Sequence, residues 1–336
     1  RPGEKLFEEL SLSEEDVTKT DNDKIFVMKP MDFDSEKLSA QIKELERSAL
    51  EDEPQEMFKI VNKKMLNPTV CEMDILAPLV AKKAEPGQFI ILRVDEDGER
   101  IPLTVADYDR EKGTVAVIFQ IVGATTEQLN HKNEGEYLQD FAGPLGVASK
   151  LDNLKKVCIV GGGVGCAIAM PIAEALHGMG ADVTSIIGFR NKEALILEDE
   201  FKACSDTLRI MTDDGSFGEH GNVTVPLKEI LESGEKFDMI ITIGPLIMMK
   251  FVVATTKPLG VKTTVSMNPV MIDGTGMCGG CRLTVGGETK FACVDGPDFD
   301  GFEVDFDEAI QRASMYKDFE RHAYDAACNL LQKEVQ

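Results

Sequence analysis

The chain is poor in positive charge. Its 36 lysine and arginine residues are outnumbered by 59 aspartate and glutamate residues, which gives a formal net charge of −23 at pH 7. Binding to nucleic acid or to an anionic membrane needs a basic patch on the surface. The composition therefore argues against a nucleic-acid-binding or membrane-adhering protein, and it favours small molecules or other proteins as partners.

The sequence also lacks a long apolar run. Its most apolar stretches, Val157 to Met170 and Met239 to Met249, are too short to span a bilayer and contain glycine or proline. No signal peptide opens the chain, and eight scattered cysteines fit a reducing compartment better than a disulfide framework. We therefore expect a cytoplasmic protein, and the length of 336 residues suggests two or three domains.

Histidine is scarce as well. The four histidines are scattered at His131, His177, His220 and His322. They support neither a histidine metal site nor a catalytic triad, and no nucleophile motif is present. We therefore predict no catalytic side chain.

Three cysteines and one aspartate follow a recognisable spacing near the end of the chain. Asp273, Cys278, Cys281 and Cys293 are separated by four, two and eleven residues. This is the ligand spacing of plant-type [2Fe–2S] ferredoxins with aspartate in place of the first cysteine, and a carboxylate can bind ferric iron. The glycines between the ligands allow positive φ and a close approach of backbone amides to sulfur. A zinc site or unreactive cysteines are the alternatives, but zinc usually takes two Cys pairs or Cys with His.

Two regions of different pattern precede the cysteines. The first has short β-branched runs between turn signals, which predicts a small antiparallel barrel. Its expected strands are Phe58 to Lys63, Val70 to Ile75, Phe89 to Val94 and Thr114 to Val122. From Lys155 strands and helices alternate, which predicts a doubly wound nucleotide-binding α/β domain. An amphipathic helical segment from Phe306 to Lys333 follows the cysteines.

These patterns predict five parts. We expect an acidic extension over residues 1–56, a β barrel over 57–150, an α/β domain over 151–266, a small cluster-binding loop domain over 267–303 and a helical segment over 304–336. The extension, which opens with RPGEKLFEEL, resembles the C-terminal tail of nucleotide-sugar epimerases and dehydratases. The chain starts without methionine and Met57 begins a segment that reads as complete, so we expect residues 1–56 to be a fusion remnant.

A glycine-rich turn stands at the start of the α/β domain. Gly161-Gly162-Gly163-Val164-Gly165 follows a buried strand and opens a helix, where backbone amides and the helix dipole suit a pyrophosphate. The next strand ends in Gly188-Phe-Arg190, without the acidic residue that would bind a ribose 2′-hydroxyl. The choice between NAD and NADP stays open at this point, and a glycine turn used only for packing is the simpler alternative.

The barrel pattern, the glycine turn, Gly244-Pro245 and the cysteine loop together resemble the ferredoxin-NADP reductase superfamily, from Met57 to the C-terminus. Within it they resemble flavin and iron–sulfur electron-transfer subunits. The aspartate-containing pattern is most similar to the small (alpha) subunit of NADH-dependent reduced ferredoxin:NADP oxidoreductases, also known as a sulfide dehydrogenase subunit. The related electron-transfer subunit of dihydroorotate dehydrogenase uses four cysteines, so Asp273 favours the first group.

This resemblance implies a function and a set of cofactors. The chain is expected to bind FAD, a [2Fe–2S] cluster and NAD(H), with NADP(H) not excluded, and to pass electrons among them. Its implied partner is a larger iron–sulfur flavoprotein subunit, and the implied overall activity is flavin-based electron bifurcation with ferredoxin and NADP(H). Two other interpretations are electron supply to a dihydroorotate dehydrogenase, and a non-enzymatic redox-sensing or assembly module with a vestigial flavin site.

The resemblance also implies binding residues. The superfamily's flavin element, Arg-x-Tyr-Ser/Thr, is matched by Arg100-Ile-Pro-Leu-Thr104 without its tyrosine, and an exposed arginine that leads a barrel strand is the alternative. The flavin residues expected from this match and from two further turns are Arg100, Pro102, Leu103, Thr104, Val122, Gly123, Thr125, Thr126, Gly143 and Gly146. The nucleotide residues expected are Gly161, Gly162, Gly163, Gly165, Asp213, Asp214, Gly215, Gly244 and Pro245. A merely solvated loop is the alternative for Asp213 to Gly215.

Overall fold

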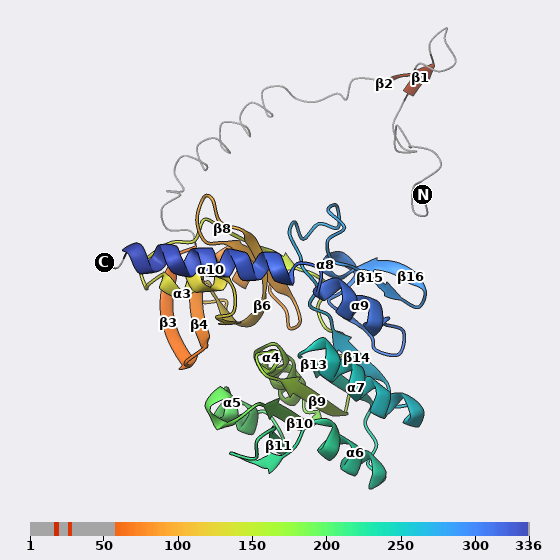
Figure 1. Cartoon of the computed structure of the whole chain (residues 1–336). Coiled ribbons are helices and arrows are strands. Elements are labelled where there is room, and N and C mark those ends of the chain that lie inside the picture. The colour runs from red at the N-terminus through yellow and green to blue at the C-terminus, as the bar shows by residue number, and fades with distance from the viewer. Residues whose placement is uncertain (1–16, 20–25, 29–57, 335–336) are drawn as a thin grey trace. The chain divides into compact units, whose positions relative to one another are not determined.

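A computed structural model describes residues 17–19, 26–28 and 58–334 (Figure 1). The chain divides into two compact units, residues 1–55 and 56–336. The described part of the first unit is one antiparallel pair, β1 (Val17–Lys19) and β2 (Phe26–Met28). The rest of the predicted epimerase-like extension lies outside the described residues.

The second unit begins with a six-stranded antiparallel barrel. Its strand order is β3-β4-β7-β6-β5-β8, and a bridge between Lys59 and Tyr137 joins the chain beside the two edge strands. Along β4 buried residues alternate with less buried ones, so that Cys71, Met73 and Ile75 face the core. The elements are β3 (Ile60–Asn67), β4 (Val70–Leu76), α2 (Pro78–Ala81), β5 (Phe89–Arg93), β6 (Arg100–Asp109), β7 (Thr114–Gln120), α3 (Ala124–His131) and β8 (Asp140–Leu145).

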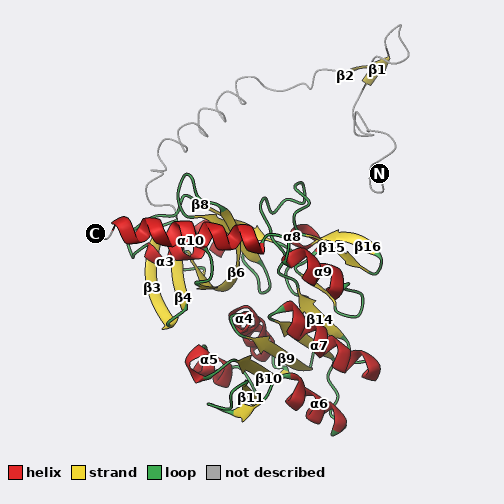
Figure 2. Cartoon of the chain, viewed as in Figure 1, coloured by secondary structure: helices red, strands yellow, loops and turns green. Residues whose placement is uncertain are grey.

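A seven-stranded sheet follows, in the order β12-β11-β10-β9-β13-β14-β17. All neighbours are parallel except β14 and β17. The central strand β9 is buried on both faces, because Val157 and Ile159 pack with α4 and α5 while Cys158 and Val160 pack with α6 and α7. Helices accordingly lie on either side of the strands (Figure 2).

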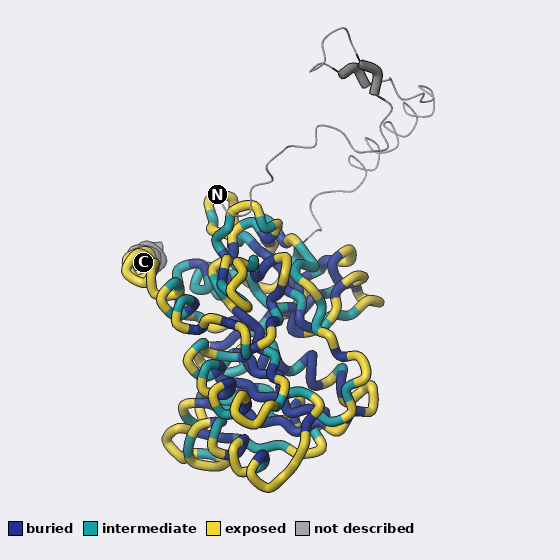
Figure 3. Tube along the Cα trace, turned by 90° about the vertical axis from the view of Figure 1, so that its right-hand side faces the viewer, coloured by how far each residue is buried: buried dark blue, intermediate teal, exposed yellow. Residues whose placement is uncertain are grey.

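The elements of this α/β part are β9 (Lys156–Gly162), α4 (Gly165–Gly178), β10 (Asp182–Phe189), η1 (Lys192–Ala194), α5 (Glu198–Ala203), β11 (Thr207–Thr212), β12 (Glu219–His220), α6 (Thr224–Glu232), β13 (Met239–Ile243), α7 (Leu246–Thr256), η2 (Lys257–Leu259), β14 (Thr263–Ser266) and β17 (Asp298–Asp300). In Figure 3 buried segments run through both the barrel and this sheet, and exposed residues lie mainly in the loops.

The cysteine loop is an insertion in the sheet. The chain leaves the sheet after β14 and returns as β17, whose residues 298–300 were predicted to belong to a separate cluster domain. Strand β17 therefore belongs to the seven-stranded sheet. The predicted domain boundaries themselves remain predictions. The inserted part contains an antiparallel hairpin and one helical turn, namely β15 (Arg282–Val285), β16 (Glu288–Phe291) and α8 (Ala292–Asp295).

The chain ends in two helices, within the helical segment expected from the sequence. Helix α9 (Phe306–Ala313) packs on α7 and β15, and α10 (Lys317–Glu334) lies along α3 of the barrel (Figure 1). The residues between them, Ser314 to Tyr316, are a turn. In the described part of the chain, no helix has both the length and the apolar character needed to cross a bilayer.

Candidate functional site

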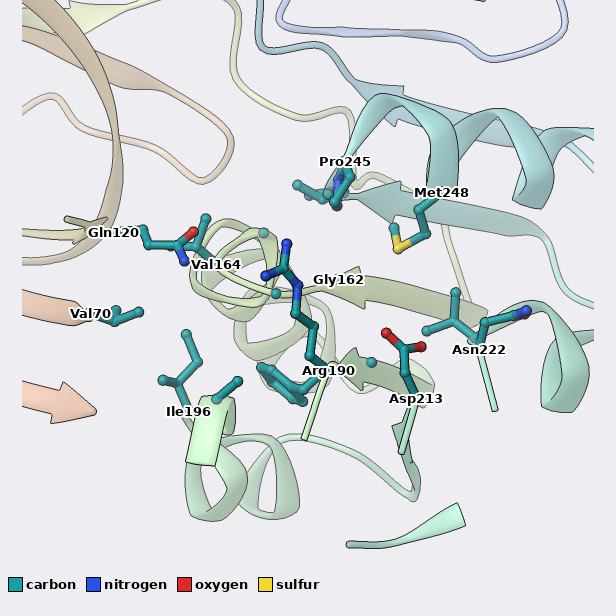
Figure 4. Close-up of a pocket in the computed structure, with 18 of the residues that line it drawn as sticks. Val70, Gln120, Gly162, Val164, Arg190, Ile196, Asp213, Asn222, Pro245 and Met248 are labelled. Atoms are coloured by element: carbon teal, nitrogen blue, oxygen red, sulfur yellow. The ribbon is translucent and has the colours of Figure 1, made fainter. Parts of the chain in front are cut away.

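A cavity of about 870 Å³ lies at the carboxyl ends of the parallel strands (Figure 4). The turn between β3 and β4 of the barrel also lines this cavity. In that turn, Asn67 Nδ2 donates a hydrogen bond to Ala194 O of the α/β part at 3.2 Å. This end of an open parallel sheet is where doubly wound folds bind nucleotides. The lining includes six residues that the sequence predicted for the nucleotide, Gly162, Gly163, Gly165, Asp213, Gly244 and Pro245.

The glycine turn is shaped for a close approach of helix α4 to the sheet. A Cβ on Gly165 would lie 2.6 Å from the carbonyl oxygen of Ile243, so only glycine fits there. Gly163 has φ +56°. No side chain caps the N-terminus of α4, and the amides of Cys166 and Ala167 donate to the carbonyl oxygens of Gly163 and Val164 at 3.1 and 3.0 Å. The positive end of the helix dipole at Gly165 faces the cavity, where it favours an anionic group. Gly161 is buried, and a Cβ there would lie 2.9 Å from Cys166 Sγ.

The loop after β11 is divided between two roles. Asp213 lines the cavity, whereas Asp214 and Gly215 lie outside its lining. The Asp214 carboxylate accepts a hydrogen bond from the Ser216 amide at 2.9 Å, and hydrogen bonds from Ser216 lower the pKa of Asp214. Asp214 therefore stabilises its own turn.

Several lining residues were not predicted as site residues. They include Arg190, Glu193, Asn222 and Met248. Arg190 follows the carboxyl end of β10 directly, so the rule that ligands bind at strand ends could have found it. The pattern around Met248 is that of an ordinary buried helix, which carries no such signal.

The predicted flavin residues on β6 face the barrel's own strand β5. Pro102, Leu103 and Thr104 are half-buried and pair with Ile91, Ile90 and Phe89, in that order. These residues lie outside the lining of the nucleotide cavity. Leu103 packs against the barrel core, and Pro102 and Thr104, two residues apart, belong to the opposite face of the strand.

Arg100 at the start of β6 belongs to a small charged group. Asp140 on β8 lies 2.8 Å from Arg93 Nε and 3.5 Å from Arg100 Nη2. Arg100 is exposed, so its guanidinium is available to a phosphate beyond this ion pair.

The second predicted flavin element is the first turn of α3. Thr126 Oγ1 accepts hydrogen bonds from the amides of Val122 and Gly123, both at 3.0 Å. The Thr125 hydroxyl donates to Glu99 at 3.3 Å. The two amides expected to meet the FAD phosphates therefore have a partner inside the helix cap, and the turn is held rigid.

Gly143 and Gly146 let the linker after the barrel pack tightly. A Cβ on Gly143 would lie 2.5 Å from Ile90 Cγ2, and one on Gly146 would lie 2.8 Å from Phe89 Cε1 and 3.0 Å from the carbonyl oxygen of Gly296. Gly146 also has φ +75°. The linker is thus fixed against both β5 and the segment that follows the cysteine loop.

The four predicted iron ligands form two pairs in the cysteine loop. The Asp273 carboxylate accepts the amides of Thr275 at 2.8 Å and Cys278 at 2.7 Å. The Cys293 amide donates to Cys281 Sγ at 3.4 Å. Cys281 and Cys293 are buried, whereas Cys278 is exposed.

The chemistry of these side chains suits a cluster with two metal positions. Amide hydrogen bonds lower the pKa of Asp273, which keeps its carboxylate ionised. Burial, and then the neighbouring Cys281 thiol, raise the pKa of Cys293 to about 12, so this thiol must lose its proton when it binds metal. Among the described residues, no three His, Cys, Asp or Glu side chains gather closely enough to hold a single metal ion. The four ligands of a [2Fe–2S] cluster are instead divided between two irons.

Contacts made by the barrel connect the predicted nucleotide, flavin and cluster sites. Helix α4, which starts at the glycine turn, packs on β6, the strand of the predicted flavin residues. On the other side a Cβ on Gly274 of the cysteine loop would lie 3.0 Å from Ile91 Cδ1 and 2.7 Å from Leu145 Cδ1. Ile91 pairs with Pro102 across β5 and β6. The barrel thus contacts both the helix of the glycine turn and the cysteine loop, and the cysteine loop also packs directly on α7 of the α/β part.

Comparison with known proteins identifies the cysteine loop first. Residues 268–305 match the iron–sulfur cluster binding domain of dihydroorotate dehydrogenase B. A Thermotoga maritima homologue of the electron transfer subunit of dihydroorotate dehydrogenase B (NAD(+)) is 47% identical over 80% of this chain and 94% of its own length. The electron transfer subunit from Geobacillus thermodenitrificans is 33% identical over 74% of this chain and 98% of its own length.

A solved structure adds the fold. A chain from the structure of the NADH-dependent reduced ferredoxin-NADP oxidoreductase, studied for flavin-based electron bifurcation, is 44% identical with a TM-score of 0.76. The match covers 80% of this chain and 97% of that one. The comparisons confirm the predicted barrel and α/β fold and the predicted resemblance. The chain therefore belongs to the family of dihydroorotate dehydrogenase B electron-transfer subunits and their homologues.

Proposed function

We propose that this chain passes electrons between NAD(H), FAD and a [2Fe–2S] cluster, and from the cluster to a larger partner subunit. Its relatives are electron-transfer subunits, as the sequence predicted. The observation that carries the proposal is the order of contacts, in which α4 packs on β6 and Gly274 packs on Ile91 and Leu145. The barrel contacts both the helix of the glycine turn and the cysteine loop, as a path from the nucleotide through the flavin to the cluster requires.

The nucleotide occupies the cavity in this proposal. The uncapped start of α4 and the glycine turn bind its pyrophosphate, and Gly244-Pro245 bounds the site on the β13 side. The proposed flavin site is the β6 face, with Arg100 on the pyrophosphate and Pro102 and Thr104 along the ring. Because α4 packs on β6, a nucleotide at the glycine turn is held close to this face.

The proposed ligands of each iron are the two residues that a hydrogen bond already joins. Asp273 and Cys278 bind one iron, and Cys281 and Cys293 bind the other. Backbone amides of the loop already point at ligand sulfurs, since the Gly280 amide donates to Cys278 Sγ at 3.4 Å. The match to an iron–sulfur domain supports this site over zinc.

When bound, FAD would supply two-electron hydride chemistry with NADH, and the cluster held by Asp273 and the three cysteines would supply single-electron transfer. The protein's side chains position these groups, and no acid or base is required of them. The family assigns the chain to the oxidoreductases. We further propose that it acts in a ferredoxin:NADP oxidoreductase, because a chain of that enzyme is 44% identical over 97% of its length and because Asp273 stands where the dihydroorotate dehydrogenase subunits are expected to have a fourth cysteine.

The exit for electrons lies at the surface of the cysteine loop. Cys278 is exposed, and the neighbouring side chains of Ile272 and Met277 are 51% and 88% exposed. An apolar rim beside an exposed ligand suits a protein partner. Supply of electrons to a dihydroorotate dehydrogenase is the second candidate, favoured by the iron–sulfur domain match.

The test is an anaerobic titration of the purified chain with NADH, followed by visible absorption and EPR. We expect bleaching of a flavin band together with a rhombic S = 1/2 signal. A flavin that is reduced without any cluster signal would contradict the Asp273 and cysteine ligand set. Orotate formation by a co-purified partner would instead identify the dihydroorotate dehydrogenase system.

A further inference from the structure

Two arginine side chains bind successive carbonyl groups in the turn between Cys278 and Cys281. We infer that Arg282 and Arg312 are positioning residues that hold this turn and raise the reduction potential of the cluster that it would bind. This inference rests on the proposed cluster site. It adds to the proposed function two residues, neither of them an iron ligand, that set how readily the cluster accepts an electron.

Arg282 acts on the first of these carbonyl groups. Its Nη1 donates to Gly279 O at 3.0 Å, and its backbone amide donates to the same oxygen at 3.4 Å. The N–H of that same peptide group belongs to Gly280 and donates to Cys278 Sγ at 3.4 Å. A donor on the carbonyl oxygen of a peptide group strengthens the hydrogen bond that its N–H gives. Arg282 therefore strengthens an amide–sulfur hydrogen bond to a proposed iron ligand, and such hydrogen bonds tune cluster potentials.

Arg312 reaches the second carbonyl group from a helix outside the loop. Its Nη2 donates to Gly280 O at 3.2 Å. Arg312 is half-buried in the last turn of α9. This helix is fixed on β15, because Glu308 accepts the Thr284 amide at 3.1 Å and the Asp305 amide donates to Thr284 O at 3.0 Å. The guanidinium is thus held beside the cysteine loop by contacts that do not depend on the loop itself.

The charge of the two guanidinium groups favours a reduced cluster. Their hydrogen-bond partners in the turn are neutral carbonyl oxygens, whereas Lys290 on the neighbouring strand β16 is paired with Glu288 at 2.9 Å. Reduction adds one electron to a site that three thiolates and a carboxylate already make negative, in a chain of net charge −23. A positive charge close to the site stabilises this reduced form more than the oxidised form. Both arginines should therefore raise the potential.

An anaerobic redox titration with dithionite, followed by EPR, measures the cluster potential in the purified full chain whether or not NADH reduces it. We expect Arg282→Gln and Arg312→Gln each to lower the equilibrium constant for one-electron reduction about tenfold, which is about 59 mV. The variants Arg282→Lys and Arg312→Lys keep the charge and should recover most of this loss. Arg321→Gln removes the same charge from an exposed residue of α10 and should leave the potential unchanged.

An unchanged potential in either glutamine variant, or an equal fall in its lysine variant, would overturn the inference for that arginine. Arg282 is exposed, so Arg282→Gln opens no cavity and still tests the inference if Arg312→Gln loses its iron. A cluster that NADH does not reduce would count against the proposed electron path, while the potentials would still test the role of the arginines. An unsubstituted chain that binds no cluster would refute both.

Discussion

At the scale of single residues, the site depends on positions where no other side chain fits or where one atom type is needed. Gly165 is the first kind, because the backbone of Ile243 and Gly244 occupies the space of any Cβ. Asp273 is an example of the second kind, because its carboxylate oxygens accept hydrogen bonds from two backbone amides of the cysteine loop. Both can be tested by one substitution each.

Gly165→Ala should destabilise the protein by about 1–3 kcal/mol, since the new methyl group meets backbone that cannot rotate away. Gly178, the last residue of the same helix, has open space where a methyl group would point, with no neighbouring atom within 4 Å, so Gly178→Ala is the matched control. The control should be neutral or more stable by at most about 1 kcal/mol. Urea unfolding measures both, and equal stabilities would contradict the steric argument.

Asp273→Cys should leave an iron–sulfur cluster in place but change its reduction potential, because a thiolate replaces a carboxylate on iron. Iron content and a redox titration followed by EPR measure the two quantities. Complete loss of iron in this variant, or a potential identical to that of the unsubstituted chain, would count against Asp273 as a ligand.

At the scale of elements, the contact between the cysteine loop and the barrel sets the distance from this loop to the proposed flavin face. Gly274 has φ +74° and touches Leu145 of β8 and Ile91 of β5. A methyl group there meets the terminal methyl groups of these two side chains, so either the side chains shift or the loop moves away from the barrel. The contact therefore controls the distance between the cysteine loop and the barrel, and it does not determine how either of them folds.

Gly274→Ala should slow reduction of the cluster after the flavin is reduced, while flavin reduction by NADH keeps its rate. The control is Gly287→Ala in the β15–β16 turn, which has φ +79° but nothing within 4 Å, so it introduces the backbone strain without the clash. Anaerobic stopped-flow absorption resolves the two steps. Slowing of equal size in both variants would point to general strain instead of loop displacement.

The elements that the sequence predicted well are those with a clear period. The apolar run of β9 and the glycine turn indicated a parallel sheet, and the short β-branched runs indicated β3, β4, β5 and β7. Strand β8 contains Gly143 and Pro144, and β17 is three residues with two aspartates, so neither carries a strand signal. The break at Ser314 between α9 and α10 also lacks glycine or proline.

The site was predictable where it depends on local spacing and not where it depends on register. The cysteine spacing and the glycine turn are each contained in one segment of chain. Arg190 and Asp213 meet because β10 and β11 run in parallel with a particular register. Ser149 and Asp298 are 149 residues apart, and only the folded chain brings them together.

At the scale of the whole molecule, Asp298 ties the barrel linker to the sheet. Its Oδ2 accepts the Ser149 hydroxyl at 2.5 Å, and Asp298 pairs across the strands with Ser266 at the end of β14. Its Oδ1 is buried, with no hydrogen-bond partner among the described residues. Burial raises the pKa of Asp298, with the two serine hydrogen bonds acting in the opposite direction.

The raised pKa predicts a pH dependence of stability. The folded chain holds the Asp298 proton at pH values where the unfolded chain has released it, so stability falls as pH rises from about 4 through the folded pKa. Asp298→Asn should remove this fall, which urea midpoints between about pH 4 and 8 can measure. Asp300→Asn, an exposed carboxylate on the same strand, is the control and should keep the slope. An unaltered slope in Asp298→Asn would refute the assignment.

The insertion of the cysteine loop between β14 and β17 has a consequence for how such chains can vary. Ser266 and Asp298 are paired residues of neighbouring strands, so the chain between them leaves and re-enters the sheet at one place. A loop with adjacent ends can change its length or its ligand set without shifting the strands that hold it. The cysteine loop is thus an exchangeable module on a fixed nucleotide-binding frame, and an exchange of ligands such as the proposed aspartate for cysteine can leave the architecture of the rest of the chain unchanged.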